Sequence, residues 1–176
     1  HLPTDAEWQT LETTLGMAPG DLAISNYATV RGVAGVAGGV PVGTQLKVGG
    51  TSGMNFLPAG YRHVPAAGAT YESLGNKTYL WVNSLLSTNP FRRKLVTNPA
   101  AGEDAASVYR FTNSAGTFAI SVRLIKDGSD GHTKDENIGG AIYKTIYMGG
   151  RQWMGENLRW HPAGTVGIWN AGDAAA

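Results

Sequence analysis

Glycine-rich turns divide this chain into short segments, and this division limits the possible folds more than any other feature. Of the 176 residues, 25 are glycine and only 15% are charged. So low a charge content argues against charge-rich disorder, and short alternating segments between turn residues are typical of β-strands joined by tight turns. We therefore expect one globular domain, rich in strands and loops, as in secreted and surface proteins.

The clearest helix signal lies at the start of the chain. Thr4 can act as an N-cap, and Glu7 stands three residues later, where it completes a capping box. Gly16 is a suitable C-terminal stop. We expect a helix over Asp5–Leu15 whose buried face carries the residues at helical spacing, Trp8, Leu11 and Leu15. A short second helix is expected within Val40–Lys47.

The rest of the chain has a β texture. The last two expected strands, Ile142–Met148 and Arg151–Met154, are expected to form a hairpin through Gly149-Gly150. In Phe118–Ile125 the apolar residues alternate with Ser121 and Arg123, so Arg123 is expected on the face away from the core. The expected strands are Phe56–Arg62, Thr78–Ser84, Phe91–Thr97, Ser107–Thr112, Phe118–Ile125, Ile142–Met148 and Arg151–Met154.

Charge gives no indication of a polyanionic partner. The formal net charge is +1, and the densest basic cluster is Arg92-Arg93-Lys94. We interpret this cluster as part of an alternating strand whose charges lie in solvent. Nucleic-acid binders concentrate Lys and Arg on one face, so no nucleic-acid partner is expected.

Four segments resemble the Fibrobacter succinogenes major paralogous domain, a bacterial surface module thought to adopt a C-type-lectin-like fold. They are His1–Trp8 (HLPTDAEW), Leu57–Arg62 (LPAGYR), Phe118–Arg123 (FAISVR), and Tyr143–Leu158, which contains YKTI and GRQWMGENL. The resemblance implies an α+β chain with one main N-terminal helix, a short second helix and twisted antiparallel sheets. It also implies an extracellular, cell-surface location.

The order of these motifs departs from the family, in which the YKT…WMAENL hairpin precedes the helix motif. Here the hairpin comes last, so we expect a lectin-like core over 1–125, a polar linker over 126–141, and a hairpin and loop over 142–176. Three explanations stay open: the hairpin folds back on its own core, it completes the sheet of a neighbouring copy, or the chain is one unit of a tandem array. The last two make a polymer.

The leading hypothesis is therefore a structural or assembly protein that self-associates through a terminal hairpin. The residues expected to carry this exchange are Ile142, Tyr143, Ile146, Trp153, Met154 and Leu158. The alternative is an adhesion module that binds a carbohydrate or a protein. For that function the candidate residues are the aromatic side chains of irregular stretches, Trp160, Trp169, Tyr71 and Tyr27, together with Arg62 and Arg92. The aromatic residues of the matched motifs, Trp8, Trp81, Trp153, Tyr79 and Phe118, are expected mainly in the core.

No catalytic or metal-binding pattern stands out. Cysteine is absent, which excludes disulfides and thiolate sites, and the four histidines have no metal-ligand spacing. The sugar-binding calcium pattern is incomplete, because no acid follows Trp81-Val82-Asn83 and no glutamate precedes Asn89-Pro90. The acidic linker residues, Asp127, Asp130, Asp135 and Glu136, are interpreted as a solvated loop. Glu7, Glu72 and Glu156 are the carboxylates considered for glycosidase chemistry, and Glu7 is better explained as a cap. We expect no enzyme activity and no cofactor, and no apolar run is long enough to span a membrane.

Overall fold

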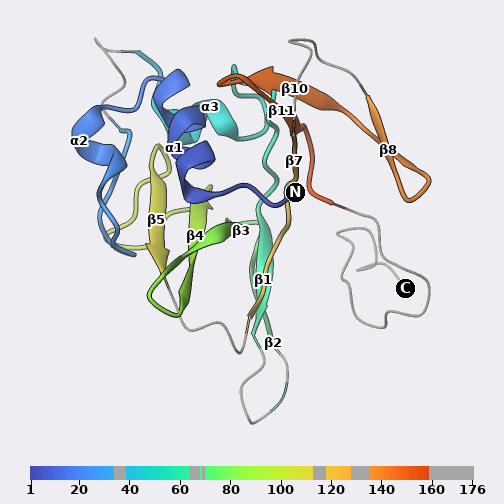
Figure 1. Ribbon diagram of the computed structural model, residues 1–176. Coiled ribbons are helices and arrows are strands. Elements are labelled where there is room, and N and C mark those ends of the chain that lie inside the picture. The colour runs from blue at the N-terminus through green and yellow to red at the C-terminus, as the bar shows by residue number, and fades with distance from the viewer. Residues whose placement is uncertain (34–38, 64–67, 69, 113–117, 128–134, 159–176) are drawn as a thin grey trace.

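The computed structural model describes residues 1–33, 39–63, 68, 70–112, 118–127 and 135–158. In the described residues three helices combine with short strands, and the helices lie on the same side of β1–β5 (within 59–112) as β10 and β11 (within 145–154) do, so the chain is α+β, as expected (Figure 1). The helices are α1 (Asp5–Thr14), α2 (Pro19–Leu22) and α3 (Val42–Leu46). The main helix and the short helix near Val40–Lys47 were predicted, whereas α2 was not.

Helix α1 begins at the expected residue, Asp5, and ends at Thr14, one residue before the expected end. The Thr4 hydroxyl accepts a hydrogen bond from the Glu7 amide, and the Glu7 carboxylate accepts one from the Thr4 amide at 2.9 Å, which completes the capping box. At the other end Gly16 has φ 93°, and the Met17 amide donates to the Glu12 carbonyl oxygen at 2.9 Å. This is the Schellman arrangement, in which a left-handed glycine ends the helix.

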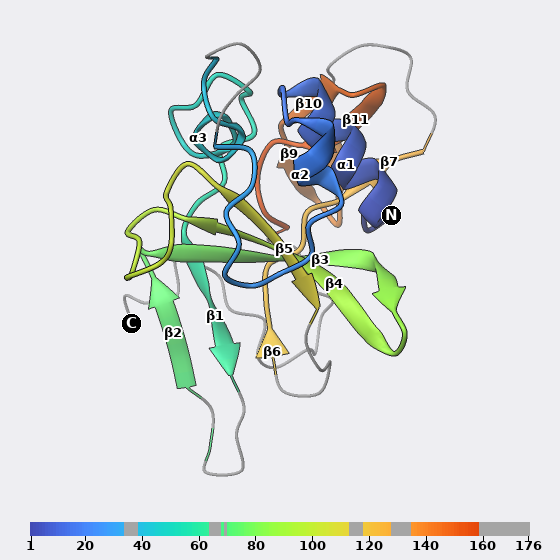
Figure 2. The same cartoon turned by 90° about the vertical axis from the view of Figure 1, so that its left-hand side faces the viewer.

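The larger sheet has the strand order β2-β1-β3-β4-β5, and β6 pairs with the far part of β1 (Figure 2). All its pairs are antiparallel except a single parallel contact of β1 with β3. Its strands are β1 (Ala59–His63), β2 (Thr70–Leu74), β3 (Lys77–Leu86), β4 (Asn89–Val96), β5 (Val108–Thr112) and β6 (Phe118–Ala119). Strand β2 was not predicted.

A smaller sheet contains the terminal hairpin. Its order is β10-β11-β7, with β7 at Ile125–Lys126, β10 at Thr145–Met148 and β11 at Arg151–Met154. The predicted turn is confirmed, because Gly149 and Gly150 both have positive φ (59° and 74°). The expected strand Ile142–Met148 is interrupted at Lys144, and its first part, β9 (Ala141–Tyr143), pairs with β8 (Glu136–Ile138) in the segment interpreted as linker.

The two faces of the larger sheet are both covered. Leu80 and Leu95 face α1 and belong to the main core, which also contains Trp8 and Trp153. Tyr79 and Val96, the next residues along the same strands, point the other way and belong to a second, aromatic cluster with Tyr109 and Phe111. A strand buried on both faces leaves no solvent side for its charged residues.

Because both faces of β4 are covered, the prediction that the charges of the basic cluster Arg92-Arg93-Lys94 lie in solvent is wrong. Arg92, Arg93 and Lys94 lie in β4 and are all buried, with 2%, 0% and 0% of their surface exposed. Arg93 meets two carboxylates on the α1 face, and Arg92 and Lys94 lie among aromatic rings on the opposite face. Alternation along the strand was predicted, but the chemistry of the two faces was not.

The segment Phe118–Ile125 also differs from the prediction. It is not one strand, because only Phe118–Ala119 and Ile125–Lys126 are strands and Ser121 forms an isolated bridge with Leu80. Arg123, expected away from the core, is 1% exposed. Of the aromatic residues expected in the core, Trp8, Trp153 and Tyr79 are buried, whereas Trp81 and Phe118 are only half-buried.

Candidate functional site

The terminal hairpin packs against α1, although the two lie more than 130 residues apart in the sequence. The Trp153 ring packs edge-on against Trp8, with ring centroids 5.3 Å apart, and both side chains are buried. The turn also approaches the helix closely: a Cβ at Gly149 would lie 3.3 Å from the Thr10 methyl carbon and 3.2 Å from the Thr14 hydroxyl. The hairpin therefore closes the main core.

Main-chain bonds fix the hairpin to the preceding part of the chain. Strand β11 pairs with β7 through Trp153 and Ile125, and the Met154 amide donates to the Leu124 carbonyl oxygen at 3.0 Å. The Leu158 amide donates to the Val122 carbonyl oxygen at 2.9 Å. Within the hairpin, the buried side-chain amide of Gln152 donates to the Thr145 hydroxyl at 2.8 Å. The main-chain pairing of β11 with β7 is that of a strand added to a sheet edge.

Arg123 joins the hairpin to the core through its side chain. Its guanidinium donates to the carbonyl oxygen of Met154 at 3.1 Å and to that of Met54, and it lies 3.8 Å from the centre of the Phe56 ring. It also donates to the Asn157 side-chain oxygen at 2.9 Å. Burial lowers the pKa of Arg123 to about 9, although the negative charge of Glu156 acts to raise it. Sequence reasoning placed Arg123 on the solvent side and so missed it.

The residues expected to carry the hairpin's contacts divide into two groups. Tyr143, Trp153 and Met154 are buried, and Ile146 is partly buried and packs against the main core. Leu158 is half-buried beside Val122. Ile142 is 55% exposed and lies outside the docked surface.

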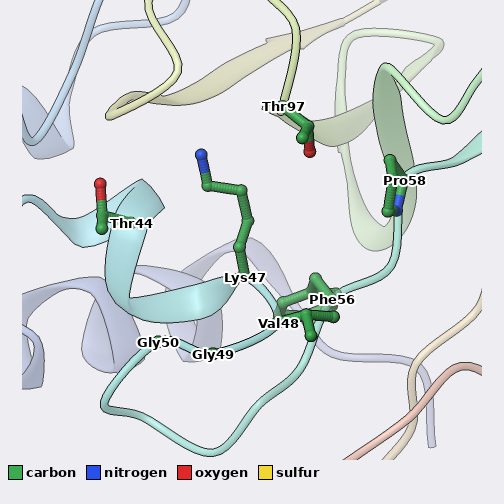
Figure 3. Close-up of a pocket in the computed structure, with 8 residues that line it drawn as sticks. All are labelled: Thr44, Lys47, Val48, Gly49, Gly50, Phe56, Pro58 and Thr97. Carbon is green, nitrogen blue, oxygen red and sulfur yellow. The ribbon is translucent and has the colours of Figure 1, made fainter.

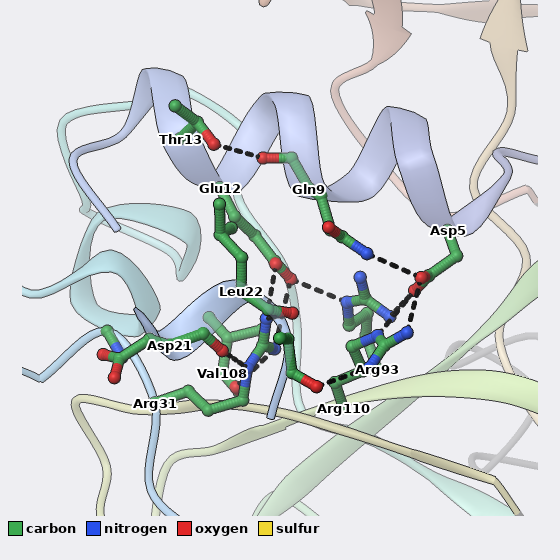
Figure 4. A network of polar contacts seen from close by, with 12 residues as sticks. Asp5, Gln9, Glu12, Thr13, Asp21, Leu22, Arg31, Arg93, Val108 and Arg110 are labelled. Carbon is green, nitrogen blue, oxygen red and sulfur yellow. Dashed lines mark hydrogen bonds and ion pairs between the residues drawn. The ribbon is translucent and has the colours of Figure 1, made fainter. Parts of the chain in front are cut away.

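A buried network of charges lies under α1 (Figure 4). Glu12, fully buried, accepts hydrogen bonds from Arg31 Nη2 at 2.8 Å and from Arg93 Nε at 2.6 Å. Asp5 accepts from Arg93 at 2.8 Å and from Arg110 at 2.9 and 2.7 Å. Because Asp5, Trp8, Glu12 and Leu15 share one side of the helix, spacing alone could have indicated that Glu12 is buried.

These carboxylates are committed to ion pairs. Burial raises the pKa of Asp5, but hydrogen bonds and charge from Arg110 and Arg93 outweigh it, and the pKa falls from 3.8 to about 2. A general acid needs a pKa near the working pH, so Asp5 is unsuited to that role. Glu7 is held in the capping box, and Glu72 accepts a bond from the Tyr61 hydroxyl. Each of these groups has a structural task.

A cavity of about 310 Å³ lies beside α3 (Figure 3). Lys47 extends across it, between Thr44 and Thr97, and its ammonium group donates to the carbonyl oxygens of Val96 (3.0 Å) and Ala105. Burial lowers the pKa of Lys47, and Asp104 opposes this. Neither a carboxylate nor a histidine lines the cavity, so its lining offers Lys47 no acid–base partner.

The residues expected to bind a ligand are only partly described. Arg62 and Tyr71 are opposite each other in the β1–β2 pair, which puts them on the same face, and Tyr71 is 58% exposed. Trp160 and Trp169 lie outside the described residues, as does Asp130. In the described part of the chain no three His, Asp or Glu side chains form a metal-binding group. No helix there has the length and apolarity to cross a membrane.

Comparison with known proteins indicates the family of this chain. Neither the curated proteins nor the solved structures contain a significant match to this chain. The profile of the Fibrobacter succinogenes major domain matches residues 1–126, more than two thirds of the chain, and this range ends at β7, before the terminal hairpin. This chain therefore belongs to the Fibrobacter succinogenes major domain family.

Proposed function

We propose that this protein is a non-enzymatic, extracellular assembly module of C-type-lectin-like fold, whose terminal hairpin docks on α1 of a neighbouring copy. The observation that carries the proposal is the position of Trp153. This residue lies beyond the family-matched range 1–126, yet it is buried against Trp8 in the core of that range. The matched part therefore depends for its core on a segment attached to its end.

The contacts of the hairpin are compatible with exchange between copies. In the single chain, β11 binds β7 and α1 of the same molecule. Every one of these bonds can form equally with a second copy, because exchange of an identical element replaces each contact by its equivalent. A chain of such exchanges that does not close into a ring gives a filament.

The length of the segment between β7 and β10 determines whether the hairpin docks on its own core or on that of a neighbouring copy. Eighteen residues, 127–144, separate β7 from β10, and so many residues span at most about 60 Å when extended. A tethered segment of this length meets its own docking site at an effective concentration on the order of 1 mM. Exchange therefore competes with closure only where copies are crowded, as on a cell surface or within a tandem array.

Refolding at different concentrations tests the proposal. The chain is unfolded, refolded at about 10 µM and at about 1 mM, and analysed by size-exclusion chromatography with light scattering. We expect monomers at the low concentration and a series of oligomers at the high one. Deletion of residues 128–134 shortens the connection from 18 to 11 residues and is expected to favour oligomers at both. Ile142→Ser, at an exposed position, is the control and leaves the distribution unchanged. Monomers of every variant at every concentration would contradict the proposal.

The alternative function is adhesion through binding of a carbohydrate or a protein. What favours it is the exposure of Tyr71 beside Arg62 on the β1–β2 hairpin, because exposed tyrosine and arginine side chains are enriched at binding surfaces. A glycan array with Tyr71→Ala and Trp169→Ala variants separates the two functions. Binding that survives in a monomer supports adhesion, and uniformly flat signals remove its support.

A further inference from the structure

The sheet face turned away from α1 contains an aromatic cavity. The cavity has a volume of about 180 Å³. We call it the aromatic pocket; it is lined by Tyr27, Tyr61, Tyr79, Arg92, Phe111, Phe118 and Ile120. Tyr27 comes from the loop after α2 and Ile120 follows β6, and the other lining residues lie in the strands of the larger sheet.

The pocket has the size and lining of a site for one ring. Tyr61 and Tyr79 meet with centroids 4.9 Å apart at 70°, and Tyr27 meets Phe111 at 5.0 Å and 89°. An apolar cavity of about 150 Å³ holds a benzene molecule, so about 180 Å³ holds a six-membered ring with a small substituent. Tyr27 is 48% exposed, and the pocket is therefore reached from solvent on its side.

Arg92 gives the pocket its charge. Its guanidinium carbon lies 4.6 Å from the centre of the Trp81 ring and 4.7 Å from that of Phe118, and these rings hold it in one orientation. Burial lowers the pKa of Arg92, and Tyr79 opposes this. A guanidinium in such a dry, fixed position suits a carboxylate, which it can bind through two parallel hydrogen bonds.

The phenol groups add hydrogen-bonding capacity. The hydroxyls of Tyr27 and Tyr79 are 3.4 Å apart at the pocket. Burial raises the pKa of Tyr79 and of Tyr61, so both hydroxyls stay protonated at neutral pH. The Tyr61 hydroxyl already donates to Glu72, so the hydroxyls of Tyr27 and Tyr79 are the ones that a ligand can engage. A few polar groups among apolar walls are typical of small-ligand sites.

We propose that the aromatic pocket binds a six-membered ring bearing a carboxylate, with the ring against the tyrosine and phenylalanine walls and the carboxylate toward Arg92. Two kinds of molecule carry this group: a uronic acid unit of a polysaccharide and an aromatic acid. The pocket lies on the opposite face of the sheet from the hairpin contact, so this proposal is independent of hairpin exchange.

The test compares ligands on the unaltered chain. Amide chemical shifts, with total tryptophan fluorescence as a second readout, are followed during titration with glucuronate, glucose, benzoate and benzyl alcohol, each up to about 20 mM. We expect at least one carboxylate to bind about tenfold or more tightly than its neutral counterpart, since a charge-assisted hydrogen bond contributes about 1.5–3 kcal/mol. Glucuronate alone identifies a sugar site, and benzoate alone identifies an aromatic-acid site. Equal binding within both pairs, or no binding by any of the four, overturns the proposal.

Two tyrosine variants locate the site. Tyr27→Ala removes a partly exposed wall of the pocket and is expected to weaken carboxylate binding at least fivefold. Tyr71→Ala removes a side chain of similar exposure from β2 and is expected to bind as the unaltered chain does. Thermal melting of both variants confirms that they are folded. Equal losses in the two variants would place the ligand elsewhere and overturn the assignment.

Discussion

Replacement of Glu12 by glutamine tests the buried charge network. Glu12 is the only carboxylate within ion-pair distance of Arg31 among the described residues; the other acceptors of that guanidinium are the carbonyl oxygens of Asp21, Leu22 and Val108. The network holds three guanidinium groups and two carboxylates, Asp5 and Glu12. Glu12→Gln therefore keeps the shape of the side chain but raises the buried net charge from +1 to +2.

Loss of one partner from a buried ion pair costs about 3–5 kcal/mol, because the remaining charge stays out of water. With a urea dependence of about 2 kcal/mol per molar, we expect the unfolding midpoint to fall by about 2 M. Glu136→Gln is the matched control: Glu136 pairs with Lys126 at 2.6 Å on the surface, and exposed pairs contribute about 0–1 kcal/mol. Unfolding is followed by tryptophan fluorescence and circular dichroism.

A second variant separates lost charge pairing from general damage. Glu12→Gln combined with Arg31→Met removes both members of the Glu12–Arg31 pair and returns the buried net charge to +1. Replacement of both members of a buried ion pair by uncharged side chains avoids the cost of an unpaired buried charge. The double variant should recover much of the lost stability. The reasoning is refuted if Glu12→Gln is no more destabilising than Glu136→Gln, or if the double variant is less stable than the single one by the full cost of a second buried substitution.

Three further predictions concern acid, the helix cap and the hairpin. Glu103 accepts hydrogen bonds from Lys77 at 2.9 Å and from Lys94 at 3.0 Å, and its pKa, like that of Asp5, is lowered to about 2. The stability that these two carboxylates provide is therefore fully present above about pH 4.5 and is lost as the pH falls toward 2. Asp5→Asn should reduce the dependence of the unfolding free energy on pH across that range, and an unchanged dependence would count against the assignment. Thr4→Ala should cost about 1 kcal/mol in chemical denaturation through loss of the N-cap, whereas no change would mean that water replaces the cap. Trp153→Ala should cost about 3–5 kcal/mol, and a cost below about 1 kcal/mol would show that the hairpin does not close the core.

Local signals predicted what local chemistry determines. The capping box of Thr4 and Glu7, the stop at Gly16 and the turn at Gly149-Gly150 all form as expected, because each depends on residues a few positions apart. The family resemblance is confirmed over 1–126. The burial of Glu12 could also have been predicted from the sequence, since Glu12 stands four residues after Trp8 on the same helix face.

Tertiary packing determined the rest. Arg92 and Lys94 alternate with Arg93, as in any half-exposed strand, and nothing local indicates that the aromatic side chains of β5 and the loop after α2 cover their face. Arg123 was misplaced because alternation assumes a regular strand, and the chain between β6 and β7 is not one. The aromatic pocket was missed because its walls come from segments up to about 90 residues apart.

Disulfide trapping tests hairpin exchange most directly. The chain has no cysteine, so Thr14→Cys and Gly149→Cys introduce the only two thiols, at positions where a Cβ on residue 149 lies 3.2 Å from the Thr14 hydroxyl. Cysteine at the positive φ of Gly149 costs about 1–2 kcal/mol, which a chain with a closed core tolerates. After refolding at about 1 mM and mild oxidation, the account predicts a ladder of disulfide-linked oligomers on a non-reducing gel, and at about 10 µM a cross-linked monomer. A cross-linked monomer alone at both concentrations would contradict exchange, and the absence of any cross-link would contradict the docking of the hairpin on α1.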